Sequence, residues 1–252
     1  MGNTEGKVLI ASSALKESGF DGLATIKVAA ESSYSGCQLY LDARYRDESY
    51  RAKVIESILK VRGIRPDFIL VVHLPNAEKF SGEDAVAVSE IGQRVSGARF
   101  LIHFDRDAEI TKVENFEIEL ENASTGTFDT TEVKEVWERV LATDRAIVLD
   151  FGRFWYGEEQ DLERIIEFTK WQINRLNPDK GDMLHLTDKT KMMTFRTYAC
   201  VLGQGLVKLV MPEVLDFMKR GGVVVLEYED LEMENASRDY LLDQYHSMGG
   251  KI

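Results

Sequence analysis

The feature that most constrains this chain is a regular alternation of short β-rich apolar runs with longer segments of helical period. The pattern continues from one end to the other without a linker rich in proline, glycine or serine. A typical helical segment is 49–62, with Val54, Ile55 and Ile58 on one face. We expect strands at residues 8–11, 38–41, 68–73, 100–103, 116–121, 146–150, 183–185 and 223–227.

Eight strand–helix units in 252 residues match the usual size of a closed parallel (β/α)8 barrel. We therefore expect an α/β TIM barrel that forms a single domain over residues 1–252. The connection 105–115 is too short for a crossover helix with its loops, so the fourth βα unit should be abbreviated. A doubly wound open sheet is the competitor, but the first strand runs into Ser12-Ser13-Ala14 instead of a glycine-rich turn.

The charge of the chain bears on its partners. With 31 basic and 43 acidic side chains the formal charge is −12, which argues against nucleic acid because phosphodiester binding depends on Lys and Arg. No apolar run approaches the roughly 18 to 20 residues that span a bilayer, and the first residues lack the apolar stretch of a signal peptide. We expect a cytoplasmic protein with no membrane or nucleic-acid partner.

The expected strands end in residues that can bind metal. Six of them finish in order with His73, His103, Glu121, Asp150, His185 and Glu227. Any one of these alone is more often a hydrogen-bonded boundary residue than a ligand. Together they are six residues capable of binding a divalent metal, at the end of a barrel where active sites form. Mixed carboxylate and imidazole ligands suit Mn, Mg, Co, Fe or Zn.

The order of these residues resembles the xylose-isomerase-like barrel superfamily, which contains sugar isomerases, sugar epimerases and zinc apurinic endonucleases. The resemblance covers nearly the whole chain and depends on the order of short, loose motifs. These motifs are Val71-Val72-His73-Leu74-Pro75, Leu120-Glu121-Asn122, Leu149-Asp150-Phe151-Gly152-Arg153, Leu184-His185-Leu186-Thr187-Asp188, Leu202-Gly203-Gln204-Gly205 and Val225-Leu226-Glu227.

The isomerase and epimerase branch implies one divalent metal ion (Mn, Mg, Co or Zn) held by Glu121, Asp150, His185 and Glu227. It also implies that Glu121 and Glu227 act as acid and base on opposite faces of the substrate. The expected reaction is isomerisation or epimerisation of a sugar, sugar phosphate or related hydroxy-carbonyl compound through an enediolate.

The endonuclease branch implies three zinc ions and uses histidines matching His73 and His103. Its further ligands are replaced here by Arg153, Thr197 and Ala199. A three-zinc cluster is therefore not expected, and nuclease activity is disfavoured. We expect His73 and His103 to line the mouth and contact substrate without binding the principal metal.

Two cations suggest a small-molecule substrate that is anionic. Arg153 stands where the family has a substrate-binding histidine, and Lys191 lies six residues after His185, where epimerases often have an arginine. A salt bridge from Arg153 to Glu121, Glu227 or Glu229 remains an equal alternative.

Other interpretations stay open. A lyase or dehydratase of a polyol acid would use the same enediolate chemistry, and a catalytically lapsed barrel would only bind a ligand or partner. Glu119 shares a strand face with Glu121, so it needs a cation inside the barrel unless the strand is irregular. The aromatic run in 151–156 could stack on a sugar, form a contact within a homo-oligomer, or pack its own loop.

Overall fold

The computed structural model describes residues 6–76, 79–104, 118–122, 138, 141–142, 144–153, 155, 162–191 and 198–250. Within these residues, eight parallel strands pair in sequence order and close into a barrel through β1 and β8. The strands are β1 Lys7–Ala11, β2 Gly36–Tyr40, β3 Ile69–His73, β4 Arg99–Phe104, β5 Ile118–Asn122, β6 Ile147–Asp150, β7 Met183–Leu186 and β8 Val223–Leu226. The expected closed parallel barrel is confirmed; residues 105–117, where we expected the abbreviated unit, lie outside the described residues.

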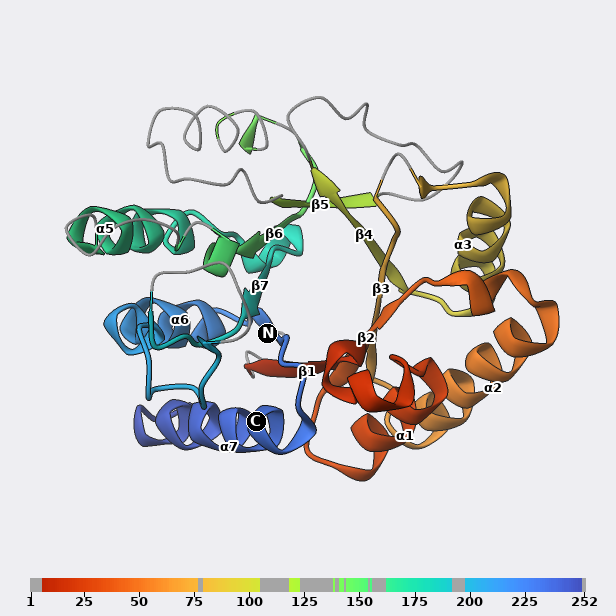
Figure 1. Cartoon of the computed structure of the whole chain (residues 1–252), viewed down its shortest axis with the longest axis horizontal. Helices are drawn as coiled ribbons and strands as arrows, with labels where there is room; N and C mark the ends of the chain where they lie inside the picture. Colours follow the sequence, from red (N-terminus) through yellow and green to blue (C-terminus); the bar gives the residue numbers. More distant parts are fainter. Residues whose placement is uncertain are drawn as a thin grey trace.

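The helices surround the ring of strands (Figure 1). They are α1 Gly22–Glu31, α2 Glu48–Ile64, α3 Gly82–Arg94, α5 Leu162–Ile173, α6 Met211–Lys219 and α7 Leu231–Ser247. Several begin at a side chain that accepts hydrogen bonds from the first turn: Asp21 caps α1, Asp47 caps α2 and Asp230 caps α7. None of the described helices is long and apolar enough to cross a membrane.

The buried apolar residues form two clusters. The larger cluster joins the outer faces of the strands to the helices. The smaller cluster fills the barrel interior with Leu9, Ala11, Val71, Leu101, Val148, Met183, Val223 and Val225. Because side chains alternate along a strand, the residue two positions after an interior residue also points inward. The last inward positions therefore gather at the mouth of the barrel, where the carboxyl ends of the strands meet.

An ion pair between a buried carboxylate and a partly buried guanidinium lies at the opposite end of the barrel. Arg99 Nε is 2.6 Å from Glu119 Oε1, and the same guanidinium donates to the carbonyl oxygen of Gly181. Burial raises the pKa of Glu119 above its ordinary value, and the charge of Arg99 lowers it in part. Of the two alternatives that we considered for Glu119, pairing with a cation inside the barrel is confirmed.

Replacing Arg99 with leucine should destabilise the protein by about 3 to 5 kcal/mol at neutral pH, because it leaves a buried carboxylate without its partner. The pKa of Glu119 in the folded protein is already above its unfolded value, and losing Arg99 raises it further. The folded state then takes up a proton first as pH falls, so the destabilisation should shrink in acid and grow toward neutral pH. Urea denaturation at a series of pH values measures this. The double variant Arg99→Leu/Glu119→Leu should recover most of the loss; an unchanged loss would contradict the pairing.

Candidate active site at the barrel mouth

Because side chains alternate along each strand, the expected site residues face inward and lie together at the mouth of the barrel. Each lies two positions after an interior apolar residue: His73 after Val71, His103 after Leu101, Asp150 after Val148, His185 after Met183 and Glu227 after Val225. The strand register also sets His103 beside Glu121 and Asp150 beside His185. Glu227 was expected to be the last residue of its strand, but β8 ends one position earlier, at Leu226, and Glu227 follows it.

Glu121 stands at the centre of the cluster and is fully buried. Its Oε2 lies 3.1 Å from His73 Nε2 and 3.6 Å from His185 Nδ1. Its Oε1 lies 3.1 Å from Arg153 Nη2 and 3.4 Å from His103 Nε2. One carboxylate therefore contacts groups from β3, β4, β7 and the turn after β6.

Glu227 is held by two residues of β2 that the sequence reasoning missed. Its Oε1 lies 3.4 Å from His185 Nδ1 and accepts hydrogen bonds from Gln38 Nε2 at 2.7 Å and Tyr40 Oη at 3.1 Å. Gln38 and Tyr40 are alternate residues, so both face the interior. The two-residue period of the strand is the signal that could have identified them. β2 was expected to end at Leu41, whereas Tyr40 is its last inward position.

Arg153 forms the ion pair that was one of its two expected roles. It belongs to the short 3-10 helix Phe151–Arg153 directly after β6. Its Nε lies 2.9 Å from Asp150 Oδ2, and its Nη2 donates to His103 Nε2 at 2.8 Å in addition to contacting Glu121. The guanidinium of Arg153, a permanent cation, therefore contacts both Asp150 and Glu121, two of the four expected metal ligands.

The two lysines after β7 differ in position. Lys191 is exposed, and its ammonium lies 5.3 Å from the ring centre of Tyr198 rather than in the cluster. Lys189 is buried, and its Nζ donates to the carbonyl oxygen of Gly152 at 3.0 Å, next to Asp150 and Arg153. No spacing rule distinguished the two residues in the sequence.

The aromatic run after β6 is described in part. Trp155 is fully buried, and its Nε1 donates to Thr169 Oγ1 on α5 at 3.0 Å. This residue packs its own loop against a helix, as in the third of the alternatives considered. Phe154 and Tyr156 and the side chain of Phe151 lie outside the described residues.

Comparisons with known proteins address the fold. No family model and no curated protein matches the chain. Solved structures that share its architecture include two that match nearly the whole chain. The probable 3-DHS dehydratase AsbF from Bacillus anthracis, involved in petrobactin synthesis, superposes with a TM-score of 0.63 at 11% identity, over 94% of this chain and 98% of that one. Endonuclease IV from Thermus thermophilus superposes with a TM-score of 0.62 at 12% identity, over 96% of this chain and 99% of that one. This chain shares the closed parallel (β/α)8 barrel fold of these two structures. At these identities the likeness extends to the fold alone.

Oppositely charged side chains face one another at the mouth of this barrel. Burial opposes ionisation of Glu121, but the cationic His185 and Arg153 outweigh it and hold the pKa of Glu121 well below its usual range. Burial lowers the pKa of His185, and the carboxylates of Glu227 and Glu121 raise it to about 9. Glu121 is therefore ionised at neutral pH, and His185 carries a proton when no metal ion replaces it.

Two histidines direct their Nε2 atoms toward Glu121 and toward each other. His73 Nδ1 lies 2.8 Å from the carbonyl oxygen of Leu74, and His103 Nδ1 lies 2.8 Å from Asn76 Oδ1. The two Nε2 atoms lie 3.1 Å apart. The ligand atoms of His73, His103 and Glu121 lie within 4.8 Å of one another, so this group could hold a metal ion.

The cluster as a whole fits a divalent cation. The carboxylate oxygens of Glu121 and both ring nitrogens of His185 are buried without a well-aligned hydrogen bond to any described residue. Two ligands about 2.1 Å from one ion lie roughly 3.0 to 3.4 Å apart. His185 Nδ1 approaches Glu121 and Glu227 at 3.6 and 3.4 Å, close to that spacing. Buried polar atoms left unsatisfied are costly, and a metal ion would satisfy them.

Proposed function

We propose that this protein is an enzyme that isomerises or epimerises a small sugar-like hydroxy-carbonyl compound with the help of one divalent metal ion. The observation that carries the proposal is the buried group of Glu121, His185 and Glu227, in which two carboxylates approach the same imidazole nitrogen. Glu121, Asp150, His185 and Glu227 would hold the ion. When bound, it would supply a Lewis acid for neighbouring oxygens of the substrate.

In this proposal Glu121 and Glu227 transfer the protons. Moving a proton on a carbon next to a carbonyl requires a base beside that carbon and positive charge near the developing enediolate oxygen. Glu121 and Glu227 would provide acid and base on opposite faces of the substrate. Gln38 and Tyr40 both donate to Glu227 Oε1, so they fix this carboxylate in place.

Arg153 is suited to bind an anionic group of the substrate. Three of its contacts, to Asp150, Glu121 and His103, use Nε and Nη2, and its side chain is about a quarter exposed. Burial lowers its pKa, but the surrounding carboxylates raise it more, so it stays a cation throughout the working pH range. His73 and His103, on the neighbouring strands, would contact substrate hydroxyls. The exposed Lys191 remains a candidate for the same anionic group.

A lyase or dehydratase acting on a polyol acid is the second candidate. Such an enzyme must protonate a leaving hydroxyl after it removes the proton next to the carbonyl. The hydroxyl of Tyr40, 3.1 Å from Glu227 Oε1, lies beside the proposed base and could provide that proton. One solved structure of the same fold is described as a probable dehydratase.

Hydrogen–deuterium exchange tests the proposal. Wild-type protein with Mn²⁺ in deuterated water would be incubated with a panel of aldoses, ketoses and sugar acids and followed by proton NMR. We expect deuterium to enter the carbon next to the carbonyl of at least one compound. Exchange with a rearranged product supports isomerisation or epimerisation, and exchange with loss of water supports the lyase. Absence of exchange across the panel, with metal bound, would contradict both and favour a lapsed binding protein.

A further inference from the structure

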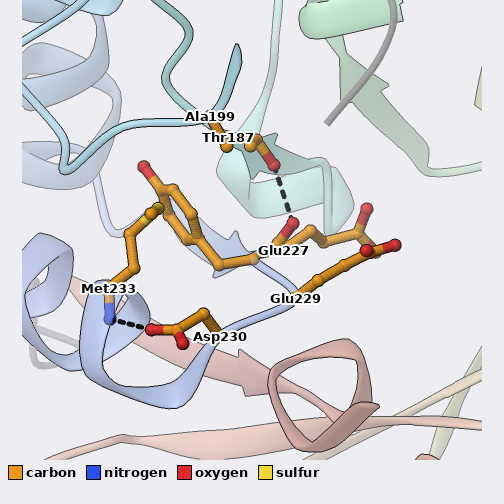
Figure 2. A pocket seen from close by; sticks show the side chains of 7 residues that line it. Thr187, Ala199, Glu227, Glu229, Asp230 and Met233 are labelled. Carbon is orange, nitrogen blue, oxygen red and sulfur yellow. Dashed lines mark hydrogen bonds between the residues drawn. The ribbon is translucent and has the colours of Figure 1, made fainter. Parts of the chain in front are cut away.

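A cavity of about 190 Å³ opens beside Glu227, between the loop after β7 and the segment that joins β8 to α7 (Figure 2). Its lining residues are Thr187, Ala199, Glu227, Tyr228, Glu229, Asp230 and Met233. At about 30 Å³ per water molecule, the volume corresponds to roughly six waters. It is large enough for a short organic chain next to the proposed base.

The carboxylates of this cavity already have donors. Glu227 Oε1 accepts hydrogen bonds from Gln38 Nε2 at 2.7 Å and Tyr40 Oη at 3.1 Å, and Lys16 Nζ is 2.5 Å from Glu229 Oε2. Asp230 accepts from the backbone N–H of Met233 at the positive end of α7. An additional ammonium group would therefore gain little, while no basic residue among the described residues that line the cavity could receive a phosphate or carboxylate.

The remaining wall groups favour a ligand that donates hydrogen bonds. Carboxylate oxygens accept only, and Thr187 Oγ1 is already used to donate to the carbonyl oxygen of Glu227 at 2.9 Å. Ala199 and Met233 supply half-buried apolar surface that can contact carbon–hydrogen groups. Tyr228 is buried, and its hydroxyl accepts from the backbone N–H of Asp188 at 3.0 Å.

We propose that this cavity is a subsite for a neutral, hydroxylated chain of three or four carbons. If the proposed function holds, this chain is the part of the substrate beyond the carbon that Glu227 faces. Its hydroxyls donate to the carboxylates, and its carbon–hydrogen faces contact Ala199 and Met233. The subsite excludes a terminal phosphate, so an anionic group of the substrate binds outside this cavity, at Arg153 or Lys191.

The test uses erythritol, a neutral four-carbon polyol, as the probe. Binding to the metal-loaded protein is measured by saturation-transfer NMR titration. Two variants fill the cavity from opposite walls, Ala199→Leu from the loop and Met233→Phe from α7. The matched control is Ala236→Leu, which adds the same bulk at an exposed position of α7. We expect erythritol to bind wild type and the control equally and each filled variant at least about tenfold more weakly, a difference of about 1.4 kcal/mol.

Three results would overturn the subsite. They are no erythritol binding to wild type, equal binding to both filled variants, or tighter binding of the charged analogues 2-amino-1,3-propanediol or glycerol phosphate than of erythritol. Metal content and deuterium exchange are measured separately on the same proteins. Polyol binding without metal or exchange would contradict the proposed function and leave the subsite intact, so the two failures are distinguishable.

Discussion

Replacing Glu227 with glutamine should lower turnover by about a hundred to ten thousand-fold, the range typical of a general acid or base. Glutamine keeps the size of the side chain and one oxygen, and it can still accept from Gln38 and Tyr40. It cannot take up the substrate proton. Because an amide also weakens metal affinity, the variant is assayed at saturating metal. Deuterium exchange into the substrate should be lost from the face that Glu227 serves.

In the Glu121→Gln variant, deuterium exchange into the substrate should be lost from the opposite face of the substrate. Glu232→Gln changes an exposed glutamate in the first turn of α7 and should leave turnover unchanged. Full exchange in both Glu121→Gln and Glu227→Gln at saturating metal would remove these residues from proton transfer, even if they remained ligands.

Replacing Asp188 with alanine should destabilise the protein by about 4 kcal/mol, the largest stability effect that we expect near the site. Its buried carboxylate accepts from four backbone N–H groups, those of Lys189, Gly203, Gly205 and Val207, at 2.8 to 2.9 Å. Alanine leaves these donors without a charged acceptor, and several of them are buried. Urea denaturation measures the change in the free energy of unfolding.

The geometry around Asp188 leaves little room for an alternative packing. A Cβ on Gly205 would lie 2.3 Å from the carbonyl oxygen of Lys189 and 2.4 Å from Asp188 Oδ1, so only glycine fits there. Asp188→Asn, which keeps one accepting oxygen, should lose clearly less stability than the alanine variant. Asp179→Ala, at an exposed position, should change stability by less than about 0.5 kcal/mol. Equal losses for Asp188→Ala and Asp179→Ala would show that the four hydrogen bonds do not stabilise the loop.

The barrel and the gathering of its polar strand ends could be predicted because both follow from periodicity. An apolar strand with a two-residue period must place His73, His103 or His185 on the same face as the interior residue two positions before it. Barrel closure then brings all these positions together, whatever the loops do.

The contacts that give each residue its chemistry could not be predicted in the same way. Whether Arg153 pairs with Asp150 or Glu229 depends on the turn after β6, and the sequence contains no periodic signal for that turn. Lys189 and Lys191 differ by two positions in an irregular loop, yet only Lys189 is buried. Gln38 was missed because our search considered only the last residue of each strand.

The central claim is that one divalent metal ion binds at Glu121, Asp150, His185 and Glu227, and metal content tests it most directly. Native protein would be analysed by mass spectrometry together with His185→Gln and with the double variant His73→Gln/His103→Gln. We predict one equivalent in wild type and in the double variant, and loss of the metal in His185→Gln. Three equivalents of bound metal would support the zinc endonuclease interpretation. Absence of bound metal would favour a catalytically lapsed barrel. Loss of metal from the double variant alone would place the ion on His73, His103 and Glu121 and contradict the proposed site.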